Sequence, residues 1–195
     1  PHIPSRPCMA SRTVRQSGRI LNISFKQVFV QNIRMQLGRR PRVLIFPELE
    51  VDLKVTSIRQ PQSSCPFDSA RQKIYGLGYH LLVFVYEKTD DDLTRTGRLN
   101  ILHTIFVSRD KTADFQTTSG LLQIIENQGN VDDILAFFAE RSLPLDDIQA
   151  MSLAEEVLAT PPSIGYLTIS NALQWRLQYR RVIQTAGTVQ GIENL

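Results

Sequence analysis

A short apolar run at Val43–Phe46 ends at Pro47, and hydrophobic and polar residues alternate along the stretch that follows Pro47. From Leu49 onward the odd-numbered residues are aliphatic and the even-numbered ones are polar, the period of two that is typical of a half-buried β-strand. We predict strand from Arg42 to Ser57, with Pro47 either bending it into two strands or marking a strand start. One face of this strand would carry Glu48, Glu50, Asp52, Lys54 and Thr56.

Beyond this strand the pattern predicts further strands and then helices. A loop at 60–66 precedes a short helix at Asp68–Tyr75, and apolar stretches predict strands at Tyr79–Lys88 and Leu99–Ser108. After residue 109 the spacing becomes helical, and helices are predicted at Gly120–Asn127, Val131–Arg141, Leu145–Leu158 and Ile169–Gln184. The expected fold class is therefore α/β, a mixed α+β sheet flanked by helices, with a helical C-terminal region.

The charge distribution divides the chain more sharply than its modest net charge of +3 implies. Residues 1–47 contain nine Lys and Arg and no Asp or Glu, whereas the remainder is acidic overall. A basic segment of this kind favours contact with a polyanion such as DNA. We expect a basic N-terminal region at 1–41, a core at 42–110 and a helical region at 111–195 that contributes to DNA reading.

Composition excludes several other classes of protein. With 195 residues and 42% hydrophobic residues, the chain is typical of a globular protein, and its apolar runs are too short to cross a membrane. Cys8 and Cys65 form no disulfide framework and no zinc-binding spacing, so two free thiols in a bacterial-type cytoplasm are expected. The missing initiator Met indicates a processed chain or a fragment.

The predicted strand carries chemistry suited to phosphodiester hydrolysis. Its polar face combines three carboxylates with one ammonium group, and Mg²⁺ prefers carboxylate and backbone oxygens as ligands. Asp52 and Lys54 lie about 6.6 Å apart along an ideal strand, which is close enough to act on one phosphate. The alternative is a solvated strand face on which Lys54 pairs with Asp52 or Glu50.

The tripeptide Asp52-Leu53-Lys54, with Pro47-Glu48 just ahead, resembles the PD-(D/E)XK signature of restriction endonucleases and related nucleases. The strand, loop, helix and buried strand that follow are similar to the order of elements in that fold, and the resemblance covers roughly residues 42–108. Among these nucleases the chain most resembles type II restriction enzymes.

The resemblance implies roles for individual residues. Asp52 would bind the metal, Lys54 would orient or deprotonate the attacking water or neutralise the oxyanion, and the backbone oxygen of Leu53 would be a further ligand. Glu48 and Glu50 compete for the first acidic position, where the family has an Asp. The implied cofactor is Mg²⁺, with Mn²⁺ as a substitute, and the implied partners are double-stranded DNA and a second copy of the chain in a homodimer.

Candidate DNA-binding residues lie in three segments of the chain. They are Arg39 and Arg40 in the basic region, Arg71 and Lys73 in the helix after the loop, and Asn171, Gln174, Arg176 and Arg180 near the C-terminus. Their amides, guanidinium groups and ammonium group are donors that suit base edges and phosphates. Two other functions remain open, namely a non-catalytic DNA-binding module and a subunit of a restriction or repair complex.

Overall fold

The computed structural model describes residues 47–63, 66–93, 95–169, 173 and 176–195. Of these, Lys88–Asn100 belong to one compact unit and the others to a second. The elements in chain order are η2 (Pro47–Leu49), β1 (Val51–Ser57), β2 (Gln62–Ser63), α2 (Ala70–Tyr75), β3 (His80–Asp91), β4 (Thr96–Val107), η3 (Arg109–Lys111), α3 (Phe115–Glu126), α4 (Val131–Glu140), α5 (Asp147–Ala159), β5 (Leu177–Gln178), α6 (Arg180–Thr185) and β6 (Ile192–Asn194). The predicted mixed α/β fold is confirmed.

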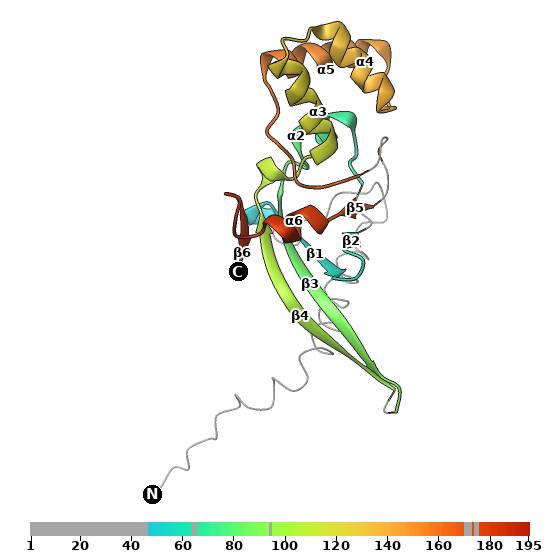
Figure 1. The fold of residues 1–195 in the computed structure, drawn as a ribbon, viewed down its shortest axis with the longest axis vertical. Helices are drawn as coiled ribbons and strands as arrows, with labels where there is room; N and C mark the ends of the chain where they lie inside the picture. The colour runs from blue at the N-terminus through green and yellow to red at the C-terminus, as the bar shows by residue number, and fades with distance from the viewer. Residues whose placement is uncertain (1–46, 64–65, 94, 170–172, 174–175) are drawn as a thin grey trace, which may run out of the picture. The chain divides into compact units, whose positions relative to one another are not determined.

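The main sheet of the described chain has four strands in the order β1-β3-β4-β6 (Figure 1). β1 runs parallel to β3, with Val51 opposite His80 and Ser57 opposite Tyr86, and residues 58–79, including α2, form the connection. β6 runs antiparallel to β4, with Ile105 opposite Asn194. Parallel neighbours need such a long connection, because a tight turn can join only antiparallel strands.

One face of the sheet packs against the principal hydrophobic core. The odd-numbered residues Leu81, Val83 and Val85 of β3 are fully buried, as are Ile105 and Val107 of β4. Residues from the C-terminal part of the chain cover this face; they include Leu167, Ile169, Leu177, Tyr179 and Val182. The even-numbered residues of β3 are only half-buried at positions 80–86, so the two faces of the strand differ in their surroundings.

A second core lies among helices α2–α5, which are drawn together in Figure 1. Ile74, Leu121, Ile134, Ala154 and Val157 are completely buried there. The three longer helices begin at side-chain caps, Asp114 for α3, Asn130 for α4 and Asp146 for α5, and the last two form capping boxes. These caps satisfy backbone N–H groups that the first helical turn leaves unpaired, as the acidic residues at the predicted helix starts indicate.

The prediction of a helix at Ile169–Gln184 is wrong. The only helix that the structure describes in this stretch is α6, Arg180–Thr185, and Leu177–Gln178 form strand β5. Thr168 pairs with Gln178 across an antiparallel bridge, and Leu167 pairs with Asp114 across a parallel one. These extended pairings bury Leu167, Ile169 and Leu177 on the sheet, and this gain of apolar burial overrides the helical spacing.

None of the described helices is both long and apolar enough to span a membrane.

Candidate active site

The polar face predicted for residues 48–56 begins at Asp52 and not at Glu48. Pro47–Leu49 form a 3-10 turn, and Glu50 adopts a φ of 52°, which turns the chain before strand β1 starts at Val51. The period of two therefore holds only from Val51 onward. The prediction that Glu48 and Glu50 share a strand face with Asp52 is wrong, because Pro47 and the turn break the alternation.

Asp52 and Lys54 form a close ion pair on β1. Lys54 Nζ lies 2.6 Å from Asp52 Oδ2, and the side chains are only 18% and 13% exposed, respectively. The second carboxylate oxygen, Oδ1, accepts a hydrogen bond of 2.9 Å from the backbone N–H of Leu53. Both oxygens of Asp52 are thus oriented by neighbours on the same strand, and a period of two brings the two charges together as predicted.

The register of the sheet explains why this pair is nearly buried. Asp52 lies opposite Leu81 and Lys54 opposite Val83 in the parallel pairing. Partners in this register point to the same face, so the two charged residues share the core-facing side of the sheet with fully buried aliphatic residues. β1 is at the edge of the described sheet, so one side of this strand has no neighbouring strand among the described residues.

A small polar network surrounds Glu50 where β1 begins. Arg109 Nη1 donates to Glu50 Oε2 at 3.2 Å, and the backbone N–H of His80 donates to the backbone oxygen of Glu50 at 2.8 Å. His80 Nδ1 accepts a hydrogen bond from the backbone N–H of Arg109, and its ring stacks on Phe106 with centroids 5.2 Å apart. Sequence reasoning missed His80 and Arg109, since their proximity to Glu50 depends on the parallel pairing of β1 with β3.

The donor set around Asp52 suits a metal ion that keeps most of its water. In the part of the chain that the structure describes, no group of three or more His, Cys, Asp and Glu residues gathers as a metal cage. Mg²⁺ commonly binds through one or two carboxylates together with waters and substrate phosphate oxygens. A single well-oriented carboxylate next to a nearly buried cation meets that requirement, so the residues present fit a divalent ion shared with the substrate.

The candidate DNA-binding residues have different environments. Arg71 is 62% exposed on α2 and pairs with Glu156, while Arg176 and Arg180 are exposed at either side of β5. Asn171 and Gln174 lie outside the described residues, as do Arg39 and Arg40.

Lys73 is buried, and the expectation that it lies on the surface is wrong. Its side chain is 1% exposed, and Asp114 and Arg141 are the charged groups that act on it. Burial lowers the pKa of Lys73, and the nearby Asp114 partly offsets this effect. Lys73 therefore does not reach a DNA backbone, because α2 buries this residue in the interior.

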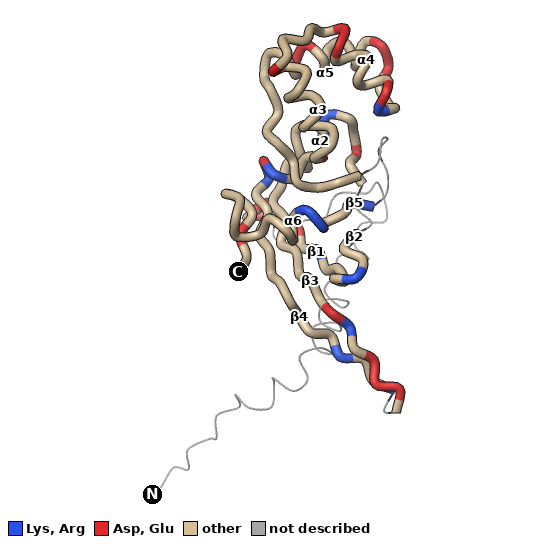
Figure 2. Tube along the Cα trace, viewed as in Figure 1, with Lys and Arg blue, Asp and Glu red and all other residues tan. Residues whose placement is uncertain are grey.

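Acidic residues are frequent on helices α4 and α5, as the colouring of Figure 2 shows. They include Asp132 and Asp133 in the first turn of α4 and Asp147 in the first turn of α5. Such charges repel a phosphate backbone, so these two helices offer a poor surface for DNA.

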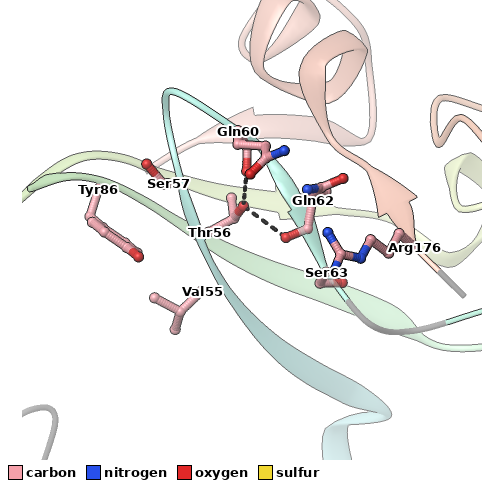
Figure 3. Close-up of a pocket in the computed structure, with 8 residues that line it drawn as sticks. All are labelled: Val55, Thr56, Ser57, Gln60, Gln62, Ser63, Tyr86 and Arg176. Carbon is pink, nitrogen blue, oxygen red and sulfur yellow. Dashed lines mark hydrogen bonds between the residues drawn. The ribbon is translucent and has the colours of Figure 1, made fainter.

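A polar pocket of about 260 Å³ opens at the carboxyl end of β1 (Figure 3). It is lined by Val55, Thr56, Ser57, Gln60, Gln62, Ser63, Tyr86 and Arg176. Sequence reasoning assigned residues 60–66 to a loop and singled out only Arg176 from this set. The two glutamines shortly after the charged strand were the available signal, but their convergence with Arg176 depends on the pairing of β2 with β5.

The chain is similar to known proteins over most of its length. A family model described as type II restriction enzyme NspV matches residues 6–194. The chain is 55% identical over 175 residues to the type II restriction enzyme NspV of Nostoc sp. (strain ATCC 29411 / PCC 7524), covering 90% of this chain and 80% of that protein. No solved structure matches.

Proposed function

Since the chain belongs to the NspV family of type II restriction enzymes, we propose that it is an endonuclease that cuts double-stranded DNA at a specific sequence. The observation that carries the proposal is the 55% identity to a type II restriction enzyme across 90% of the chain. The resemblance drawn from Asp52-Leu53-Lys54 is thereby confirmed at the level of type II restriction enzymes. The Asp52–Lys54 pair is the proposed catalytic centre, because it combines opposite charges in a nearly buried position on an edge strand.

Lys54 acts on the phosphate and on the attacking water. Its ammonium group has three N–H donors, and the pairing with Asp52 Oδ2 uses one of them. The other two donors are available to a phosphate oxygen and to the water whose oxygen forms the new bond to phosphorus. The P–O bond to the leaving oxygen breaks as the new bond forms. One proton of the water stays on the phosphate monoester and the other is transferred to the leaving oxygen, which becomes a free hydroxyl. Positive charge at this position stabilises the charge that develops on the phosphoryl oxygens.

Asp52 is the proposed ligand of a divalent metal ion, Mg²⁺ with Mn²⁺ as a substitute, together with the backbone oxygen of Leu53. When bound, such an ion polarises the phosphate and lowers the pKa of a coordinated water. The hydrogen bond from the Leu53 N–H fixes the plane of the Asp52 carboxylate. Both candidates for the other acidic position are exposed. We favour Glu50, because the N–H of His80 holds its backbone and Arg109 holds its carboxylate directly before β1.

The proposed DNA contacts come from exposed arginines. Arg71, Arg176 and Arg180 present guanidinium groups that suit phosphates and base edges. The basic stretch 1–47, with Arg39 and Arg40, adds the electrostatic attraction that DNA binding requires.

The working form is proposed to be a homodimer. Each chain contributes one Asp-Leu-Lys catalytic strand, and a double-strand cut needs two hydrolysis events, one on each strand. A twofold dimer presents the same site to both strands of a symmetric sequence. Sedimentation equilibrium of the purified chain tests this assembly: a monomer, with and without DNA, would overturn it.

The test of the function is cleavage of DNA by the purified full chain with Mg²⁺, Mn²⁺ or Ca²⁺. We expect discrete fragments from the wild type, and a loss of rate of about a thousandfold or more in Asp52→Asn and in Lys54→Met, with DNA binding retained. Asp90→Asn is the matched control, because Asp90 also pairs with a lysine two residues away but is 57% exposed.

The outcomes separate the three candidate functions. A wild-type chain that binds DNA but cuts none with any of these metals would indicate a non-catalytic DNA-binding module. A chain that neither binds nor cuts would indicate a subunit of a larger restriction or repair complex. Full activity in both Asp52→Asn and Lys54→Met would remove the proposed catalytic centre.

A further inference from the structure

The polar pocket at the carboxyl end of β1 shares its strand with the proposed catalytic pair (Figure 3). Val55, Thr56 and Ser57 line one side of it, one to five residues beyond Asp52 and Lys54. With a rise of about 3.3 Å per strand residue, Ser57 lies about 10 Å from Lys54 along the strand. Because DNA rises about 3.4 Å per base pair, a duplex whose axis runs along β1, with a phosphate at Lys54, would have a base pair about three steps away at the level of the pocket.

One wall of the pocket, the loop after β1, is held in place by hydrogen bonds of the buried Thr56 hydroxyl. Thr56 is 3% exposed, and its hydroxyl lies 3.4 Å from the backbone oxygen of Gln60 and 3.2 Å from that of Gln62. These contacts, drawn as dashed lines in Figure 3, anchor the loop after β1 to the strand. The two glutamine backbones are therefore positioned without any use of their side-chain amides.

The opposite wall is joined to this loop through the small sheet of β2 and β5. Gln62 pairs with Gln178 and Ser63 with Leu177, and the backbone N–H of Tyr179 donates to the oxygen of Pro61 at 2.8 Å. Arg176 directly precedes β5, and Figure 3 shows its side chain beside those of Gln62 and Ser63. Two segments that lie more than a hundred residues apart in the sequence thus contribute polar side chains to the same pocket.

The side chains at the mouth of the pocket keep their hydrogen-bonding capacity. Among the interactions of the described residues, neither the side-chain amides of Gln60 and Gln62 nor the guanidinium group of Arg176 takes part in a hydrogen bond or ion pair. An amide matches the donor and acceptor edge of adenine, and a guanidinium group matches the two acceptors of guanine. The backbones of the two glutamines are fixed while the amide and guanidinium groups are unused. This arrangement suits the reading of base edges better than packing within the protein.

We propose that this pocket is a specificity-determining site, in which Gln60, Gln62 and Arg176 read the edges of adjacent base pairs in the recognition sequence. This inference rests on the proposed endonuclease function and adds the residues that select the substrate. A phosphate contact by Arg176 is the alternative outcome, which would strengthen binding to every sequence equally.

The experiment sequences the cut ends of a random DNA library digested by the full-length wild type and by Gln60→Ala, Gln62→Ala and Arg176→Ala. Arg59→Ala and Gln178→Ala are the matched controls, because both residues are exposed neighbours of the pocket that do not line it. We expect selectivity at one base-pair position to fall by about tenfold or more in at least one pocket variant, with the other positions unchanged. Both controls should keep the wild-type sequence profile. Thermal melting of each variant verifies the fold.

Three results would overturn the inference. In the first, all three pocket variants keep the sequence profile of the wild type. In the second, a pocket variant loses cleavage uniformly across all sequences and its salt dependence becomes shallower, which indicates a phosphate contact. A wild type that cuts no library member would remove the proposed function and this inference with it. Cleavage by the wild type therefore distinguishes failure of the pocket from failure of the enzyme.

Discussion

Replacement of Lys54 by methionine should lower the free energy of unfolding of the metal-free protein by about 1–2 kcal/mol, between the effects typical of exposed and of fully buried pairs. At 2.6 Å and an effective dielectric constant of about 20, Coulomb attraction between Lys54 Nζ and Asp52 Oδ2 is about 6 kcal/mol. Removal of both charges from water offsets most of this gain, since the two side chains are only 18% and 13% exposed. Methionine retains much of the aliphatic contact but leaves the Asp52 carboxylate without its cation.

A double-mutant cycle separates the pair interaction from other effects of each substitution. Urea denaturation of the wild type, Asp52→Asn, Lys54→Met and the double variant in EDTA should give a coupling energy of about 1–2 kcal/mol. The matched control is the Lys88–Asp90 pair, which has the same spacing but side chains 55% and 57% exposed. Its coupling should be below about 0.5 kcal/mol, because solvent screens an exposed pair.

The same variants link the ion pair to metal binding. Mg²⁺ should stabilise Lys54→Met more than the wild type, because the ion replaces the missing positive charge, and it should leave Asp52→Asn unchanged. Equal coupling in the buried and exposed pairs, or equal stabilisation of all variants by Mg²⁺, would refute the reasoning. In the first case burial does not strengthen the coupling between Asp52 and Lys54, and in the second Asp52 does not bind the metal.

Two further predictions concern the stability of the scaffold. Gly165→Ala should destabilise the protein by about 2–3 kcal/mol in urea denaturation, because a Cβ at this position would lie 2.2 Å from the backbone oxygen of Ala113; an unchanged midpoint would refute this close approach. Burial, and to a lesser extent the negative charge of Glu156, raises the pKa of Tyr75 to about 12. The neutral phenol of Tyr75 therefore contributes its full stabilisation below pH 10, and this contribution is lost as the pH rises toward 12. The stability difference between wild type and Tyr75→Phe should therefore fall by about 1 kcal/mol between pH 9 and pH 11, and a difference independent of pH would contradict the assignment.

Much of the fold was predictable because its signals are local. The apolar stretches that became β3 and β4 and the capping residues Asn130 and Asp146 depend on neighbours within a few positions. The pairing of Asp52 with Lys54 was predictable for the same reason, since a period of two places them together. Sequence patterns of this kind report on short-range geometry.

The errors concern features that depend on distant parts of the chain. Residues 168 and 177–178 became extended because Leu167, Ile169 and Leu177 cover the sheet, although their spacing favours a helix. Lys73 has the composition of a surface residue, but α2 turns it toward α3 and Asp114. The contributions of Gln60 and Gln62 required the β2–β5 pairing, which no local pattern encodes.

The position of β1 has a consequence for the order in which the chain folds. β3 and β4 are joined by a short turn, whereas β1 reaches β3 only after the connection at 58–79 has closed. Closing a long loop costs entropy before any contact compensates for it, so we expect the hairpin to form first and β1 to dock later. An edge strand that docks late also detaches easily, and local detachment of β1 displaces Asp52 and Lys54 while the hairpin stays intact. Heating should therefore inactivate the enzyme before it unfolds the molecule as a whole.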